Sequence, residues 1–308
     1  MSAPIFIPAT TSFHPSVTPY ISVADYVNAP TAVDVSQLEP GQGDSANLME
    51  LANVIRRASS WADGICYQIL GSTQDTETAS DVFVRRDGTV RVTNRFWPML
   101  ELDSFSSGPA PSAMAAVVNT ADIWMEGRSV LVVPVAGLTY SSNPNQLPAS
   151  GPLWPGMKAY CQWTYWNGWL HTQLAASCTA AATSLTLTAE LPASAAGKSL
   201  SILDGALTEI VTIASSFTGG TTLPLLTGTV NAHTLLPFPN AVMLSALDDK
   251  AREAVISLTS CLIKLQGSSA DVMETVGDAP SKEALIQGGG LDDYQVAVDQ
   301  LDAYRADY

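Results

Sequence analysis

Residues 48–70 read LMELANVIRRASSWADGICYQIL, and this stretch decides the fold of the chain around it. Its apolar residues recur every three or four positions, which is the spacing of one face of an α-helix. The face consists of Leu48, Leu51, Ile55, Ala58, Ala62, Ile65 and Ile69. Asp44 or Ser45 can cap the first N–H groups and Gly71 can end the helix, so the pattern predicts a helix over 44–69.

A second stretch, SALDDKAREAVISLTSCLIKLQG, has the same helical spacing near the other end of the chain. Its stripe is formed by Ala251, Val255, Leu258, Leu262 and Leu265. Ser245 with Asp248 resembles a capping box, and Gly267 ends the helix, which predicts a range of 245–267. We expect the two helices to close one hydrophobic core, although they are far apart in the sequence.

Between the two helices the pattern changes to the period of two that is typical of strands. Asp87 and Gly88 stand between two alternating runs and predict a hairpin. Further strands are expected at 99–105, 123–125, 129–135 and within the aromatic stretch 156–174. Four short runs that follow, SLTLTA, KSLSIL, LTEIVTIA and TLPLLT, have the rhythm of a small barrel or sandwich.

The expected fold class is therefore α+β, with a small helical core, a large β-rich insertion and a C-terminal amphipathic helical tail. The prolines Pro4, Pro8, Pro15 and Pro19 disfavour a continuous helix near the N-terminus. The expected segments are an extended arm at 1–43, a helical core with a β-hairpin at 44–98 plus 238–270, a β-rich region at 99–237, and a hinge with a docking segment at 271–308.

The C-terminal segment opens with three glycines and then presents one helical face, formed by Leu291, Tyr294, Val298, Leu301 and Tyr304. This face can pack on the core of its own chain or dock into a groove on another protein. The glycine hinge and the terminal position favour docking.

The charge balance argues against tight binding to nucleic acid. The chain has 29 acidic and 14 basic residues and a formal charge of −15, so it offers no general attraction to a phosphate backbone. An acidic wall would instead let DNA slide past without sticking. The N-terminus lacks the basic region of a signal peptide and no apolar run approaches membrane-spanning length, so we expect a soluble protein made in a cytoplasm.

No motif of metal or nucleophilic chemistry is present. The cysteines Cys66, Cys161, Cys178 and Cys261 are too far apart to suggest a zinc site, and we expect no cofactor and no metal. His14, His171 and His233 have no acid or cysteine at ligand spacing, although a hydrolase that uses His171 or His233 stays an alternative. The segment GQGDSA at 41–46 follows Pro40 rather than a buried strand, so a helix start explains it better than a dinucleotide fingerprint.

Aromatic residues gather at 160–169, where Trp163, Trp166 and Trp169 are candidates for an interface. Three interpretations remain open: the side chains fill a β core, contact another protein, or stack on sugar rings. The last would make the chain a glycan- or receptor-binding β-module of a virion or cell surface.

Three parts of the sequence together carry a resemblance to a known family. They are LMELANVIRRASSWADGICYQIL with RFWPMLELDSFSSG; QWTYWNGWLHTQLAASCTAAATSLTLT with SLSILDGALTEIVTIAS and GTVNAHT; and DDKAREAVISLTSCLIKLQG with DDYQVAVDQLDAYR. These stretches resemble the head-to-tail adaptors, or head-tail connectors, of tailed bacteriophages, especially those that infect actinobacteria. The resemblance covers most of residues 44–308 and leaves out the arm.

The resemblance implies a structural subunit and not an enzyme. Such proteins form a ring, twelvefold in this family, at the head-tail junction of the virion, where the ring joins the portal protein to the tail or to the next connector protein. Double-stranded DNA passes through the ring without sequence-specific binding, and no membrane is involved. The family's C-terminal segment engages the portal, which makes Leu291, Tyr294, Val298, Leu301 and Tyr304 the expected portal contacts.

Overall fold

The structure is a computed structural model that describes residues 6–7, 18–36, 38–41, 43–117, 122–135, 153–235, 241–266 and 291–306. It is a mixed α+β fold with several sheets, in agreement with the predicted class. The chain divides into two compact units: unit 1 comprises 1–14, 73–168 and 307–308, and unit 2 comprises 15–72 and 169–306. The β-rich region expected at 99–237 is therefore shared between the units, with the boundary after Gly168.

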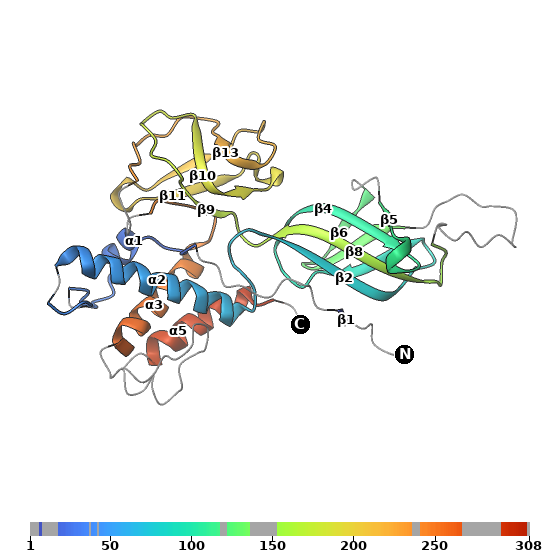
Figure 1. The fold of residues 1–308 in the computed structure, drawn as a ribbon, viewed down its shortest axis with the longest axis horizontal. Helices are drawn as coiled ribbons and strands as arrows, with labels where there is room; N and C mark the ends of the chain where they lie inside the picture. The colour runs from blue at the N-terminus through green and yellow to red at the C-terminus, as the bar shows by residue number, and fades with distance from the viewer. Residues whose placement is uncertain are drawn as a thin grey trace, which may run out of the picture. The chain divides into compact units, whose positions relative to one another are not determined.

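Unit 1 is a β-sandwich of a five-stranded and a three-stranded antiparallel sheet (Figure 1). The strand order is β1-β2-β8-β4-β5 in the larger sheet and β3-β7-β6 in the smaller one. The bounds are β1 Phe6–Ile7, β2 Thr73–Phe83, β3 Thr89–Thr93, β4 Met99–Gly108, β5 Ala115–Ala116, β6 Trp124–Glu126, β7 Val130–Pro134 and β8 Lys158–Asn167, with a 3₁₀ turn at Pro111–Ala113. Buried side chains of both sheets form one core.

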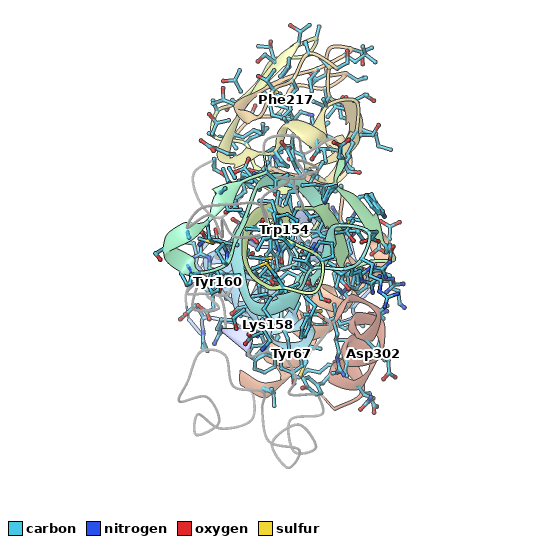
Figure 2. The ribbon with its side chains drawn as sticks, turned by 90° about the vertical axis from the view of Figure 1, so that its right-hand side faces the viewer. Tyr67, Trp154, Lys158, Tyr160, Phe217 and Asp302 are labelled. Atoms are coloured by element: carbon cyan, nitrogen blue, oxygen red, sulfur yellow. The ribbon has the colours of Figure 1, made fainter. Side chains whose placement is uncertain are left out.

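The central strand β8 shows why this sequence folds into a sandwich. In its sequence KAYCQWTYWN every second residue is buried, and the residues between them are half-buried or exposed. Ala159, Cys161, Trp163 and Tyr165 point into the core between the sheets, because side chains two apart share one face of a strand. Lys158 and Tyr160, labelled in Figure 2, belong to the opposite face.

The turn predicted at Asp87 and Gly88 forms, but the strands beside it do not pair with each other. The Arg85 N–H donates to the Thr89 carbonyl oxygen at 2.8 Å across the turn, and Gly88 has a φ of 79°. The hairpin prediction is wrong beyond the turn, because β2 pairs with β8 while β3 pairs with β7. The alternation that buries Val90 and Val92 specifies which face of the strand is buried but not which strand lies beside it. Here the strand belongs to the smaller sheet and pairs with β7.

Unit 2 contains the helical core that the sequence predicts. Its helices are α1 Val23–Asn28, α2 Asp44–Cys66, α3 Asp249–Gln266 and α5 Leu291–Leu301, with a 3₁₀ turn at Asp302–Tyr304. Helices α2, α3 and α5 lie side by side in Figure 1. Leu51 and Ile55 of α2 share one buried cluster with Leu258 and Leu262 of α3 and Leu301 of α5.

The ends of both long helices differ from their predicted positions. Helix α2 ends at Cys66, because Tyr67 adopts a left-handed conformation with φ 54° and caps the helix through its N–H. The start predicted at Ser245 is wrong: Ser245 is the last residue of strand β14, and Asp248 caps α3 by accepting a hydrogen bond from the Ala251 N–H at 2.9 Å. Strand pairing with distant residues decides the conformation of Ser245, and local sequence cannot show it.

Residues 18–36 do not form the extended arm that was predicted for 1–43. Helix α1 lies within them, and Ser22 and Asp25 form a capping box at its start. Tyr20 and Tyr26 are buried in the helical core. The prolines exclude a long helix, yet six residues between Pro19 and Pro30 suffice for a short one. Residues 1–5 and 8–17 of the predicted arm lie outside the described residues.

The other part of unit 2 is a small β-barrel. Its elements are β9 His171–Gln173, β10 Ser184–Leu191, β11 Ser199–Leu203, β12 Glu209–Thr212, β13 Gly220–Pro224 and β14 Met243–Ser245, with 3₁₀ turns at Ala193–Ala195 and Gly205–Leu207. One sheet has the order β12-β11-β14-β9 and a second joins β10 to β13. Bridges between Leu174 and Leu187 and between Ile213 and Leu225 connect the two sheets at both edges and close the barrel.

Candidate interaction surfaces and buried polar networks

The three tryptophans proposed as interface residues occupy different environments. Trp163 is fully buried in the sandwich core, stacked on Phe105 with ring centroids 6.1 Å apart. Trp163 therefore has no surface to offer a partner, and the core interpretation applies to it. Trp166 lies half-buried on the opposite face of β8. Trp169 belongs to unit 2, where it packs edge-on against Tyr304 at 5.2 Å.

The C-terminal stripe packs on its own unit. Leu301 and Tyr304 are buried in the helical core, whereas Tyr294 and Val298 are only partly covered. Helix α5 begins at Leu291, whose side chain lies outside the described residues, as does the predicted hinge at 288–290. Of the two alternatives for this face, packing on its own core describes Leu301 and Tyr304, and docking stays a prediction for Tyr294 and Val298.

Several polar contacts fix α5 and the turn after it against the rest of the unit. The Ala306 N–H donates to the Cys66 carbonyl oxygen at 2.8 Å, and Gln68 Nε2 donates to the Tyr304 carbonyl oxygen at 2.6 Å. The Tyr304 hydroxyl donates to the carboxylate of Asp248. Lys264 of α3 forms an ion pair with Asp293 at 2.6 Å. These contacts hold α5 against the other helices of the helical core.

A groove of about 270 Å³ lies along the exposed side of α2 and α5. It is lined by Trp61, Gly64, Ile65, Tyr67, Tyr294, Gln295, Val298 and Arg305. We call it the α2–α5 groove. The rings of Trp61 and Tyr294 meet edge to face at 6.4 Å, and Tyr67, labelled in Figure 2, is half exposed. A Cβ added at Gly64 would have no atom within 4 Å, so this position forms an open part of the groove.

The groove contains residues that periodicity alone does not single out. Ile65 and Val298 belong to predicted helical stripes, but Trp61 and Gly64 lie beside them. The signal available in the sequence is a second apolar spacing of four residues, from Trp61 to Ile65, next to a glycine inside a helix. A glycine there costs helix stability and so indicates a reason to keep the surface open.

An apolar patch surrounds strand β12 on the barrel. It consists of Leu207, Ile210, Leu226 and Val230, of which Ile210 and Val230 are 73% and 77% exposed. The Leu226 N–H donates to the Thr212 carbonyl oxygen, and the Val230 N–H donates to the Glu209 carboxylate, so these residues border one strand. Clustered exposed apolar side chains are typical of surfaces that contact other proteins.

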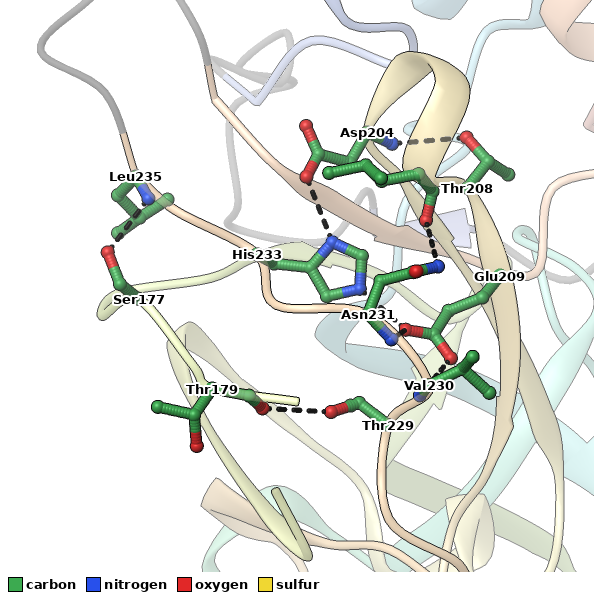
Figure 3. A network of polar contacts seen from close by, with 11 residues as sticks. Ser177, Thr179, Asp204, Thr208, Glu209, Thr229, Val230, Asn231, His233 and Leu235 are labelled. Carbon is green, nitrogen blue, oxygen red and sulfur yellow. Dashed lines mark hydrogen bonds and ion pairs between the residues drawn. The ribbon is translucent and has the colours of Figure 1, made fainter. Parts of the chain in front are cut away.

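His233 is the centre of a buried polar network in the barrel (Figure 3). Its Nδ1 is 2.9 Å from Asp204 Oδ2 and its Nε2 is 2.8 Å from Glu209 Oε1. Burial raises the pKa of Glu209, but hydrogen bonds from the Val230 and Asn231 N–H groups and from His233 outweigh burial and lower this pKa below its usual value. The carboxylates lie on opposite sides of the ring, so the network ties the turn between β11 and β12 to the segment at 229–235.

His171 and Tyr20 are buried together in unit 2, with ring centroids 5.2 Å apart. The Tyr20 hydroxyl donates to Asp63 and accepts from the N–H groups of Leu70 and Gly71. His171 Nε2 lies 2.9 Å from the Pro19 carbonyl oxygen, and its Nδ1 lies 3.0 Å from Ser245 Oγ. These contacts join the N-terminal segment to α2 and to the barrel.

Glu77 is a buried carboxyl group in the sandwich. It is 1% exposed, and its Oε1 accepts hydrogen bonds from the Tyr165 hydroxyl and from the Arg95 N–H at 3.0 Å. Its Oε2 has no hydrogen-bond partner among the described residues. Burial raises the pKa of Glu77 to about 6, against the hydrogen bonds from Tyr165 and Arg95, which lower it.

The stability of the sandwich is expected to fall as Glu77 loses its proton. Because the pKa is near 6 in the folded chain and near 4.5 when unfolded, the folded state binds more protons between these values. The free energy of unfolding should fall by about 2 kcal/mol between about pH 4 and about pH 7 from this group. The difference in denaturant stability between the wild type and Glu77→Gln, followed against pH, isolates this effect; a difference that does not change with pH contradicts it.

The described residues hold no cluster of three side chains that could bind a metal ion. Within the same residues, no helix is both long and apolar enough to cross a membrane. No protein-family model, no curated protein and no solved structure matches the chain.

Proposed function

We propose that this chain is a structural subunit of a head-to-tail connector ring of a tailed bacteriophage. The ring, twelvefold in the family that the sequence resembles, would join the portal protein to the tail at the head-tail junction of the virion. The proposal rests on that resemblance together with one observation: a groove on the helical core, with aromatic, aliphatic and polar walls, is lined by Tyr294 and Val298, two of the residues that the resemblance assigns to the portal contact.

The residues of the C-terminal stripe have different roles in this proposal. Leu301 and Tyr304 are anchors, because they are buried and hold α5 to the helical core. Tyr294 and Val298 contact the portal, since they line the α2–α5 groove together with Trp61 and Ile65 of α2. An apolar side chain of the portal fits this groove, because the aromatic and aliphatic walls recognise it through burial of apolar surface.

The charge of the chain suits a DNA conduit. With a formal charge of −15, the subunits of a ring repel a phosphate backbone that passes through it, and the DNA moves without being held. The surface also carries the apolar patch around β12, which suits contacts with adjacent proteins of the assembly.

Changing Val298 to aspartate is expected to abolish portal binding, because an apolar side chain of the portal would then have to dock against a carboxylate and strip it of water. Pairing with Arg305, which also lines the groove, does not repay that desolvation cost. Electron microscopy of the protein mixed with the portal of the same phage should show a ring beneath the wild-type portal and none with Val298→Asp. Val296 provides the matched control: it is on the same helix and 47% exposed, but it does not line the groove. Equal binding by both variants contradicts the proposed role of the groove.

A second variant separates loss of binding from loss of folding. Gly64→Gln places a side chain in the open part of the groove, where its Cβ has no atom within 4 Å, and it replaces a poor helix former by a good one. We expect a stability gain of about 0.5 to 1 kcal/mol together with loss of the ring from the portal. A variant that is more stable and still binds the portal would show that the groove is not the contact.

A further inference from the structure

Strand β2 lies near the edge of the larger sheet in unit 1. It pairs along its length with β8, from Thr73 opposite Asn167 to Phe83 opposite Lys158. On its other side the only strand paired with it in the described part of the chain is β1, through Phe6 opposite Ala79 and Ile7 opposite Thr78. A strand of eleven residues is thus covered by a strand of two.

The sequence of β2 protects this edge only in part, through the charges of Asp75 and Asp81 and the inward-pointing carboxyl group of Glu77. Natural edge strands commonly carry lysine or proline, which discourage pairing with other chains. The sequence TQDTETASDVF contains neither. A bulge between Ala79 and Val82, with Asp81 at φ 60°, disturbs only the end of the strand, and the register with β8 is regular from Thr73 to Ala79. The regular part is suited to receive a further strand by β-augmentation.

The N-terminal strand that pairs with this edge is connected to unit 2 rather than to its own sheet. Residues 15–72 belong to unit 2, and residues 8–17 separate β1 from the first described residue of that unit, Thr18. The same backbone hydrogen bonds form whether the donor and the acceptor edge belong to one chain or to two, and such an exchange has a low cost.

We infer that the edge of β2 at 73–79 is an acceptor site for the N-terminal strand of a second copy of this chain. The inference rests on the proposed ring, because a closed ring of more than two copies requires an interface between two different surfaces of each copy. The N-terminal strand and the β2 edge are two such surfaces, and each copy carries one of each. The strand of one copy therefore completes the sheet of the next around the ring.

Disulfide trapping between two chains that each carry one added cysteine tests this inference, with the Cys178→Ser background removing the one partly exposed native thiol. One chain carries Ile7→Cys and the other Thr78→Cys, because these residues face each other in the register of β1 and β2. Directly opposite side chains in an antiparallel pair lie close enough for a disulfide. The two chains are mixed, assembled on the portal and mildly oxidised; we expect a disulfide-linked dimer on a non-reducing gel. Replacing Thr78→Cys by Ala116→Cys, on β5 at the other edge of the sheet, should abolish it.

The double variant with both cysteines in one chain supplies the opposite outcome. Closure within single chains, with no dimer from the mixture, overturns the exchange and assigns the edge to the strand of its own chain. No disulfide in either experiment also overturns it. Electron microscopy of the same particles shows separately whether rings have formed. Intact rings without cross-links support the proposed function and contradict the exchange, whereas cross-linked copies without rings support the exchange and contradict the ring.

Discussion

Replacing Trp163 by alanine is expected to destabilise the sandwich by about 3–5 kcal/mol, the cost of removing a large aromatic side chain from a closed core. Trp163 is 0% exposed and stacks on Phe105. Its Nε1 donates to Asn94 Oδ1 at 2.9 Å, so the substitution also leaves the buried Asn94 without this donor. The denaturant midpoint of the sandwich, followed by the fluorescence of its remaining tryptophans or by circular dichroism, measures the loss.

Trp166 is the matched control for this prediction. It is on the same strand three residues away, and it therefore faces away from the core. Trp166→Ala should cost less than about 1 kcal/mol, as substitutions outside a core usually do. Equal losses for the two variants would mean that the faces of β8 are assigned incorrectly. Trp163→Phe keeps most of the buried area and should lie between them, since it loses the indole N–H.

Lowering the pH is expected to destabilise the helical and barrel unit by about 3 kcal/mol through His171 alone. Burial lowers the pKa of His171 from 6.5 to about 4, against the hydrogen bond to Pro19, which raises it. The Pro19 carbonyl oxygen can only accept, so Nε2 carries the proton, and Nδ1 accepts from the Ser245 hydroxyl. The neutral ring therefore satisfies both neighbours, whereas a proton on Nδ1 would place a positive charge in a fully buried site, and this cost lowers the pKa.

The direction of this effect follows from proton uptake. The unfolded chain binds a proton at His171 near pH 6.5, while the folded chain binds it only near pH 4. The stabilisation is full above about pH 6.5 and is lost as the pH falls towards about 4. His171→Gln should be less stable than the wild type at neutral pH and approach it in acid. A difference between the two chains that stays constant with pH would contradict the neutral, buried state of His171.

Glu77 and His171 give the two units opposite responses to acid. Between about pH 6 and about pH 4.5, Glu77 takes up a proton in the folded chain, which raises the free energy of unfolding of the sandwich. In the same range His171 takes up a proton mainly in the unfolded chain, which lowers the free energy of unfolding of unit 2. Two unfolding transitions should therefore move in opposite directions, apart from the effect of the other acidic groups. Comparing each variant with the wild type removes that common background.

The helices and most strands could be predicted because their apolar residues recur with the period of a helix or of a strand, and backbone geometry alone sets that period. Leu51 and Ile55 of α2, and Leu258 and Leu262 of α3, lie in one core as their spacing predicts. Sheet membership could not be predicted in the same way. Val92 alternates correctly, yet it pairs with Leu131 rather than with a residue of the preceding strand, because alternation specifies a face and not a neighbour.

The candidate site was predicted only in part, for a related reason. Tyr294 and Val298 were identified from the stripe of the C-terminal helix, and both line the groove. Leu301 on the same stripe is buried, so the helical core covers only part of this apolar face. Trp163 and Trp166 are three residues apart on one strand, and only the position of the second sheet decides which of them is buried.

The order of the chain has a consequence for its biosynthesis. The last residue of α2 is Cys66 and the first of α3 is Asp249, so a ribosome adds the 182 residues 67–248 between the two helices. At about 5–20 residues per second this takes on the order of 10–40 s. During that interval Leu51 and Ile55 have only the neighbouring N-terminal segment, with Tyr20, Ile21 and Tyr26, to cover them. Once Asn167 has been added, the sandwich has all its strands from β1 to β8. The nascent chain therefore meets chaperones with a finished sandwich and an incomplete helical core.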